Sequence, residues 1–197
     1  MIALFLASAV AADHEVSVEI GHLQNSDPTY ELFTAPNHNG MLTYGARGGV
    51  AVHDRVAVIA SWSHTRRGAW VSAGDQSFVA AWAGDFWGVG VRADLEPLPW
   101  LLPYLSAEAL LVRGLVRFDE NPDVSDNVGQ LADAALAPGG AFAVGVELRI
   151  PKGSAPFTLA WHLQAGYGLV GKLSFSTIDE EMQPGGLLVR GGMGVRF

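Results

Sequence analysis

The strongest constraint on this chain is the strict alternation of side-chain character along residues 186–197. One set of alternate positions is apolar and ends on an aromatic residue, namely Leu187, Val189, Gly191, Met193, Val195 and Phe197. The intervening set is small or basic, apart from its first member, namely Leu188, Arg190, Gly192, Gly194 and Arg196. Because successive side chains of a strand point to opposite sides, this segment is predicted to be a β-strand with two unlike faces.

The same alternation recurs along the chain and predicts eight strands, at residues 15–23, 41–52, 55–65, 86–95, 104–118, 141–150, 157–172 and 186–197. The predicted connections alternate between long and short, and the long ones cover residues 24–40, 66–83, 119–140 and 174–185. Residues 77–83 of the second long connection are expected to extend the fourth strand. An even number of membrane-length strands, with long loops at one end and short turns at the other, is typical of a transmembrane barrel. The predicted fold is an all-β, eight-stranded, antiparallel up-and-down transmembrane β-barrel.

Two local patterns interrupt this scheme. The apolar face of the fifth strand changes phase near Leu111 and Val112, which predicts a β-bulge that turns Val116 and Phe118 outward. In the third long connection, Ser125 is in position to cap a short helix over residues 127–137 that ends at Pro138-Gly139-Gly140.

Composition excludes several classes of protein. No stretch is long and apolar enough for a spanning helix, since the best candidate, residues 98–116, contains two prolines, Glu108 and Arg113. The only lysines are Lys152 and Lys172, whereas soluble proteins usually solvate their surface with lysine and glutamate. A net charge of −8 argues against a nucleic-acid partner. The absence of cysteine excludes disulfides and thiolate metal sites.

Residues 1–12 are apolar and contain the small-x-small pattern Ala9-Val10-Ala11, which is typical of a secretory signal peptide. This leader lacks the usual basic residue near its start, so it is either truncated or misassigned at its first codon. The predicted mature chain begins near Ala12 or Asp13, and residues 13–197 form one barrel domain.

The polar face of the strands is predicted to line the lumen, because it is rich in small residues and carries charges of both signs. Eight strands leave room only for side chains, so these charges are expected to pair with one another. The predicted polar network comprises Glu15, Glu19, Arg47, Arg92, Asp94, Glu108, Arg113, Glu147, Arg149, His162, Gln164, Arg190 and Arg196.

The aromatic residues divide into two predicted belts at the two membrane interfaces. The belt near the long connections comprises Tyr44, Trp62, Trp87, Phe118, Phe142 and Tyr167. The belt near the short turns comprises Trp100, Tyr104, Phe157 and Phe197.

The alternating strands and the terminal Phe197 resemble the small eight-stranded outer-membrane proteins of bacteria, the group of the outer-membrane protein A barrel and the opacity-type surface proteins. The resemblance implies an outer-membrane location with both termini in the periplasm, and Phe197 as an assembly signal. It also implies outer-membrane lipid, lipopolysaccharide and the barrel assembly machinery as partners of a monomer. Arg66 and Arg67 would then lie near lipopolysaccharide phosphates, which arginine binds well.

Few residues suggest chemistry, and the sequence predicts no cofactor, metal or catalytic residue. None of the six histidines has metal-ligand spacing. Ser63 and His64 lie where some barrel enzymes carry a lipid-cleaving pair, but no orienting carboxylate is identifiable. The carboxylates Asp119, Glu120, Asp123 and Asp126 depart from calcium-loop spacing and are expected to be solvated.

These observations favour a structural or surface-interaction role for a barrel whose lumen is plugged by paired charges, without enzymatic activity. The alternative is transport, either through a narrow pore or along a hydrophobic-solute path of the outer-membrane protein W type. An enzyme that modifies lipid A is a weaker alternative. Paired charges favour the plug, whereas an unbalanced ring of charge would favour an ion path.

Overall fold

The computed structural model describes most of the chain, namely residues 14–25, 27–33, 40–73, 76–95, 98, 100–119, 130–150, 157–176 and 181–197. The predicted signal peptide and the predicted start of the mature chain lie outside the described residues.

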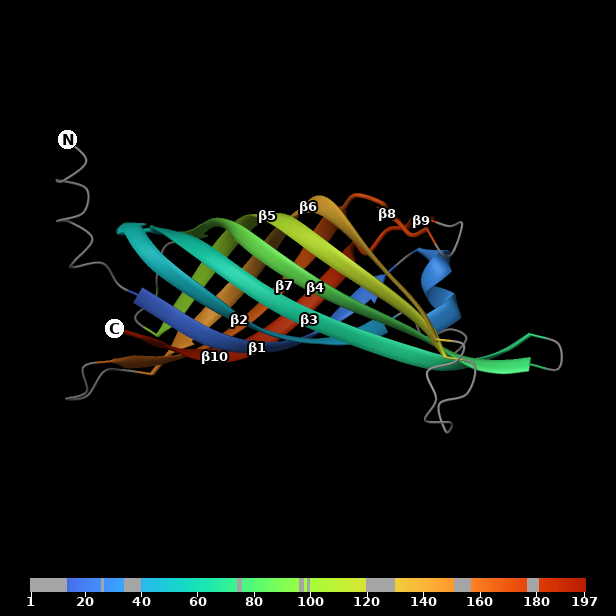
Figure 1. The fold of residues 1–197 in the computed structure, drawn as a ribbon. Coiled ribbons are helices and arrows are strands. Elements are labelled where there is room, and N and C mark those ends of the chain that lie inside the picture. Colours follow the sequence, from blue (N-terminus) through green and yellow to red (C-terminus); the bar gives the residue numbers. More distant parts are fainter. Residues whose placement is uncertain are drawn as a thin grey trace.

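Eight antiparallel strands close into a barrel with the order β1-β10-β7-β6-β5-β4-β3-β2 (Figure 1). Their bounds are β1 His14–Asn25, β2 Gly40–His53, β3 Val56–Ala73, β4 Gln76–Asp94, β5 Leu101–Asp119, β6 Gln130–Arg149, β7 Thr158–Val170 and β10 Gly186–Arg196. The predicted eight-stranded up-and-down barrel is therefore confirmed. No helix among the described residues is long and apolar enough to cross a membrane.

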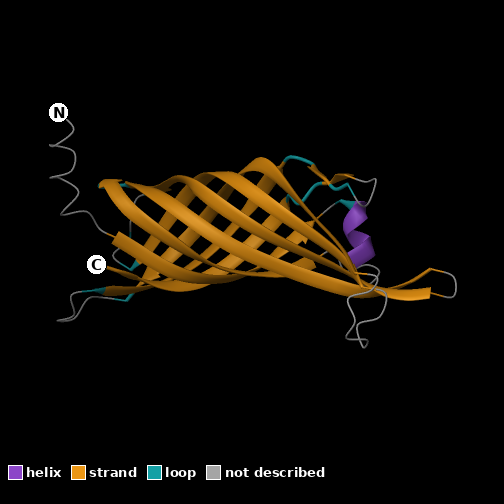
Figure 2. Cartoon of the chain, in the orientation of Figure 1, coloured by secondary structure: helices purple, strands orange, loops and turns teal. Residues whose placement is uncertain are grey.

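The first and last strands of the barrel close it. β1 pairs with β10 over eleven residue pairs in unbroken register, from Glu15 opposite Arg196 to Asn25 opposite Gly186. Backbone bonds between His14 and Phe197 continue this pairing at the end of the chain. Both ends of the described chain thus lie at the same end of the barrel as the short turns, on the left in Figures 1 and 2.

At the end of the barrel opposite the short turns, β3 and β4 extend further than predicted. β3 continues to Ala73 and β4 begins at Gln76, so residues 66–83, predicted as a long connection, form a two-stranded hairpin that projects beyond the barrel (Figure 1). The expected extension of the fourth strand over residues 77–83 is present. The prediction failed for β3 because Gly68, Gly74 and Asp75 were taken to mark a connection.

β6 contradicts the predicted helix over residues 127–137, because residues 130–137 are part of the strand. Its pairing with β7 begins at Gly139 opposite Val170, so Pro138 lies beyond the end of β7. The N–H of Gly171, which follows β7, still donates to the Pro138 carbonyl oxygen at 2.8 Å, and proline is tolerated at this end of the pairing because only its N–H is missing. Pro138-Gly139-Gly140 therefore marks the point where β6 becomes an edge strand, not the end of a helix.

β5 also differs from its prediction, because no bulge interrupts it. Its register runs without a shift against both β4 and β6 over the described strand. Val112 and Val116 are completely buried and point inward, while Arg113 between them is exposed. The change that resembled a phase shift is a change in the chemistry of the interior, which turns from polar to apolar along the barrel.

This apolar interior is closed by a cap, which we define as residues 27–33 together with residues 173–176 and 181–185. The cap contains the 3-10 helix η2 (Pro28–Phe33) and the short strands β8 (Leu173–Ser174) and β9 (Glu181–Met182). The first of these segments was predicted to be a polar loop, yet Tyr30 and Phe33 are fully buried. Burial, with Asp27 nearby, raises the pKa of Tyr30 well above its usual range.

The core beneath the cap is built from several strands. Tyr30 packs edge-on against Trp82 at a centroid distance of 5.1 Å. The buried residues of this core are Leu23, Tyr30, Phe33, Met41, Ala80, Trp82, Phe86, Val112, Val116, Ala137, Val170, Leu173, Phe175 and Met182. The lumen is therefore polar toward the short turns, which we call its lower part, and apolar beneath the cap, which we call its upper part.

The closure of the barrel predicts a specific cross-link. The chain has no cysteine, and Val18 lies opposite Met193 on the outer surface. Oxidation of the double variant Val18→Cys/Met193→Cys should join β1 to β10 and change its gel mobility without reductant. The control Val18→Cys/Val189→Cys should stay open, because Val189 lies opposite His22. Equal cross-linking of both variants would contradict this register.

Candidate functional site

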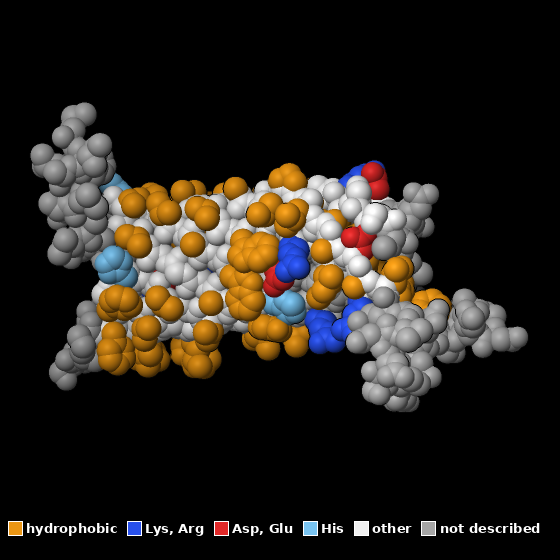
Figure 3. Space-filling model, viewed as in Figure 1, with side chains coloured by type: hydrophobic (Ala, Val, Ile, Leu, Met, Phe, Trp, Pro, Cys, Tyr) orange, Lys and Arg blue, Asp and Glu red, His pale blue; other side chains and the backbone are white. Residues whose placement is uncertain are grey.

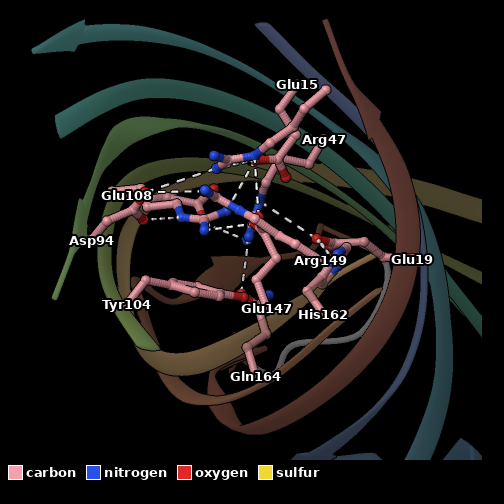
Figure 4. A network of polar contacts seen from close by, with 12 residues as sticks. Glu15, Glu19, Arg47, Asp94, Tyr104, Glu108, Glu147, Arg149, His162 and Gln164 are labelled. Carbon is pink, nitrogen blue, oxygen red and sulfur yellow. Dashed lines mark hydrogen bonds and ion pairs between the residues drawn. The ribbon is translucent and has the colours of Figure 1, made fainter. Parts of the chain in front are cut away.

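The candidate site is the polar lower part of the lumen, where inward-facing residues from all the barrel strands meet (Figure 4). We call these residues the lumenal network: Glu15, Glu19, Arg47, Ser61, Ser63, Arg92, Asp94, Tyr104, Glu108, Glu147, Arg149, His162, Gln164, Arg190 and Arg196.

Arg92 is the centre of the half nearest the short turns. Its guanidinium nitrogens lie 3.0 Å from Glu15, 2.7 Å from Asp94 and 2.6 Å from Glu147. The guanidinium carbon also lies 4.0 Å from the centre of the Tyr104 ring. Three carboxylates and an aromatic face therefore surround one side chain that is only 1% exposed.

Glu147 joins this half together, because it serves three arginines. Besides contacting Arg92, its carboxylate accepts from the Nε of Arg149 at 2.8 Å and lies 3.2 Å from the Nε of Arg196. Arg196 also lies 3.1 Å from Glu15. Glu147 is fully buried, so its negative charge is balanced only by these neighbours.

Glu19 is the centre of the half nearer the cap. One of its oxygens lies 3.4 Å from Arg47 and 3.1 Å from His162, and the other lies 3.4 Å from Arg190. Arg190 also donates to the Ser63 hydroxyl at 3.3 Å. All of these side chains are buried.

Arg47 and Tyr104 connect the two halves. Arg47 lies 3.3 Å from Glu108 and donates to the Gln164 carbonyl oxygen at 3.0 Å. The Tyr104 hydroxyl donates to the same oxygen at 3.2 Å, and Ser61 donates to Glu108. A Cβ at Gly145 would overlap the Tyr104 ring, so glycine is required for this ring to cross the lumen.

The charges of the lumenal network cancel. The five carboxylates belong to Glu15, Glu19, Asp94, Glu108 and Glu147, and the five guanidinium groups to Arg47, Arg92, Arg149, Arg190 and Arg196. An ion that is buried without a partner costs several kcal/mol, and each of these ten groups has at least one partner of opposite charge. The arrangement fills the lumen with paired side chains and leaves no ring of a single sign among the described residues.

Three of the sequence-predicted residues lie elsewhere. Arg113 is exposed on the outer surface and is not part of the lumenal network. Tyr104, predicted in an aromatic belt, is 1% exposed and lies in the lumen. Phe118, predicted in the other belt, packs inward against Phe33 and Phe78 beneath the cap. The first and last errors follow from the bulge that β5 does not contain.

The remaining predicted belt residues are exposed on the outer surface. They are Tyr44, Trp62, Trp87, Phe142 and Tyr167 of the first belt, and Trp100, Phe157 and Phe197 of the second. Trp62 lies opposite Trp87 on adjacent strands, and Phe142 lies opposite Tyr167.

A polar row crosses the outer surface next to Trp62 and Trp87. His64 lies opposite Asp85, which in turn lies opposite Arg113, and the His64 Nδ1 is 2.8 Å from an Asp85 oxygen. Arg66 is exposed on the outward face of β3, whereas Arg67 donates to the Gly40 carbonyl oxygen. Sequence reasoning missed this row because it depends on the register between strands.

The Ser63–His64 pair does not form a nucleophile and base. Ser63 points into the lumen and accepts from Arg190, while His64 lies on the opposite face with Asp85. Of the four carboxylates considered for calcium, Glu120, Asp123 and Asp126 lie outside the described residues. The fourth, Asp119, pairs with Arg117 at 3.2 Å. Within the described ranges, no three acidic or histidine side chains could hold a metal ion.

Comparison with known proteins shows similarity at the level of structure. No protein-family model matches the sequence, and no curated protein matches it. Neisserial surface protein A has a TM-score of 0.54 at 15% identity, over 93% of this chain and 95% of that one. A major outer-membrane protein from Thermus thermophilus has a TM-score of 0.55 at 15% identity, over 95% and 100%.

A further solved structure is similar over the same extent. The attachment invasion locus protein Ail of Yersinia pestis, in complex with the heparin analogue sucrose octasulfate, has a TM-score of 0.52 at 13% identity, over 94% of this chain and 99% of that one. Identities this low establish the fold alone. The chain has the fold of the small eight-stranded β-barrels of bacterial outer membranes.

Proposed function

We propose that this protein is an integral outer-membrane β-barrel with a structural or surface-interaction role and a lumen closed by paired charges. The observation that carries the proposal is the inversion of polarity across the barrel wall. Ionised groups are buried inside, and large apolar side chains are exposed outside. In water this arrangement is unfavourable on both sides of the wall, whereas in a bilayer the outer face is solvated by lipid.

The outer band supports this placement. Val18, Val89, Val144 and Leu163 each have between 56% and 63% of their surface exposed. Figure 3 shows such apolar side chains distributed over the visible barrel surface. Exposed apolar patches of this extent mark a lipid or protein interface. We assign the short-turn end, with both chain ends, to the periplasm, and Phe197 to recognition by the barrel assembly machinery.

The polar row supports contact with lipid headgroups at the opposite interface. Arg66 and Arg113 are exposed beside the Trp62–Trp87 pair, and arginine suits the phosphates of lipopolysaccharide. Arg113 therefore replaces Arg67, which is held by Gly40, in the pair of contacts expected from sequence. The opposite orientations of Ser63 and His64 support a role without catalysis.

The lipid-facing assignment predicts a dependence on depth. Leu163 lies in the middle of β7, and Ile150 follows the end of β6 near the short turns. Leu163→Arg should lower the free energy of unfolding in lipid vesicles by about 2–4 kcal/mol, and Ile150→Arg by at most about 1 kcal/mol. Urea titration followed by tryptophan fluorescence would measure both. Equal effects, or a larger effect at Ile150, would contradict the proposed membrane position.

The plug predicts a specific response to the loss of one charge. Glu147→Gln should destabilise the folded barrel by about 3–5 kcal/mol, because three arginines lose their shared buried carboxylate. The double variant Glu147→Gln/Arg149→Gln should recover part of this loss. Glu181→Gln, which breaks the exposed pair with Lys172, is the matched control and should change the stability little.

The same variants test closure of the lumen. In planar bilayers the unmodified barrel should show no large, steady openings, and Glu147→Gln should show a higher leak than Glu181→Gln. Large, steady openings of the unmodified barrel would replace the structural role by a transport role.

A further inference from the structure

We propose that the outer face of β3, β4 and β5, where these strands extend beyond the closed barrel, binds an acidic sugar of the surrounding lipopolysaccharide. The inference rests on the headgroup contact proposed above and deepens it, because it concerns the sugars that follow the lipid phosphates. It is carried by an exposed tryptophan, by a flat area of small residues beside it and by the charges around that area.

This face lies beyond the aromatic belt. β3 and β4 continue from the paired residues Trp62 and Trp87 into the hairpin that projects from the barrel (Figure 1). The distance along β3 from Trp62 to Gly68 is roughly 20 Å at about 3.3 Å per residue. A strand tilt of about 40° leaves roughly 15 Å of this along the membrane normal. Because the belt marks the lipid interface, this height corresponds to the sugars of the headgroup.

Small residues make this face flat. We call the small outward positions of β3 and β4 here the platform, namely Gly68, Val79, Ala81 and Ala83. A Cβ at Gly68 would have no heavy atom closer than 3.4 Å, so packing does not require glycine there. The missing side chain keeps the platform low, and a large side chain at position 68 would cover it.

Trp70 forms one side of the platform. It lies opposite Val79, and 66% of its surface is exposed. At this height no lipid tail covers the ring. The electron-rich face of an indole attracts the C–H groups on the apolar side of a sugar ring. Trp70 is therefore placed to stack on a sugar that lies on the platform.

The other sides of the platform carry charges. Arg66 is exposed and lies opposite Ala83. Arg117 and Asp119 lie opposite platform residues of β4, and their side chains pair at 3.2 Å. On the face of Figure 3, basic side chains gather away from the short-turn end. Two guanidinium groups and one carboxylate leave one excess positive charge, which matches a single carboxylate on a sugar.

These groups divide the recognition of an acidic sugar between them. The planar guanidinium of Arg66 suits a carboxylate, because it donates two parallel hydrogen bonds. The Arg117–Asp119 pair offers donors and acceptors to neighbouring hydroxyl groups. Arg113, which is exposed nearer the aromatic belt, remains for the lipid phosphates. The arrangement therefore favours a sugar with one carboxylate over a neutral sugar.

The test compares two lipids that differ in these sugars. Lipid A carries phosphates without an acidic sugar, and deep-rough lipopolysaccharide adds acidic octulosonate sugars to lipid A. The intact barrel is mixed with equal amounts of both lipids and of phosphatidylethanolamine, and the bound lipids are counted by native mass spectrometry. Deep-rough lipopolysaccharide should be retained over lipid A by roughly fivefold or more, and lipid A over phosphatidylethanolamine.

Variants of the platform should remove the preference for the acidic sugar without removing lipid A. Gly68→Leu, Trp70→Ala and Arg117→Gln each take away one part of the site and should bring the two lipids to equal retention. The matched controls are Gly191→Leu, at an outward position of β10 where a Cβ meets only ordinary contacts, and Arg55→Gln, exposed at a short turn. Both controls should preserve the preference. Heat-modified gel mobility would confirm that each variant is folded.

The outcomes separate the sugar site from the headgroup contact on which it rests. Equal retention of the two lipids by the unmodified barrel would overturn the sugar site alone. Retention of neither over phosphatidylethanolamine would overturn both. A preference that survives Gly68→Leu and Trp70→Ala would overturn the platform as its site. A dimer that Gly68→Leu dissociates would assign the face to a second copy of the chain and overturn the sugar.

Discussion

The structure depends on the pairing of β1 with β10. Where all eight strands are paired, this closure leaves no free edge, so backbone groups there bond to neighbouring strands without water. Closure with eight strands also fixes the width of the lumen at roughly the size of the side chains that fill it. The interior must therefore be packed, and any charge inside it must find a partner at short range. The lumenal network and the apolar core beneath the cap are two solutions to this one requirement.

The sequence was sufficient for the number of strands and for their faces where the two faces differ in polarity. In β6, the alternation of Phe142 and Val144 with Ala143 and Glu147 identifies the outer and inner sides. The assignment of faces from the sequence failed in β5, where the inward side changes from Ser106 and Glu108 to Val112 and Val116. Periodicity reports only that two faces differ, so a change of environment along one face resembles a change of phase.

The contacts between side chains of different strands could not be predicted from the sequence, for a different reason. The predicted set already contained all five carboxylates and all five guanidinium groups of the lumenal network, but the partners of Arg92 come from β1, β4 and β6. Which of these meet is decided by the register and by the curvature of the closed sheet. The cap was missed because Tyr30 and Phe33 lie in a segment whose asparagine, aspartate and proline residues are typical of a solvated loop.

The barrel strands differ in length at the end opposite the short turns, and this difference has a consequence for association with other chains. β3 continues beyond the last described β2 pair, Thr43 opposite Thr65, and β6 continues beyond its last β7 pair at Gly139. The part of the sheet that extends beyond the closed barrel, formed by β3 to β6, thus has two lateral borders. Open borders of this kind recruit strands from other molecules. Arg66 occupies one border and Pro138 the other, and charge and proline are the features that oppose such recruitment. The part of the sheet that extends beyond the closed barrel therefore carries, at both of its borders, a feature that opposes pairing with strands of other chains.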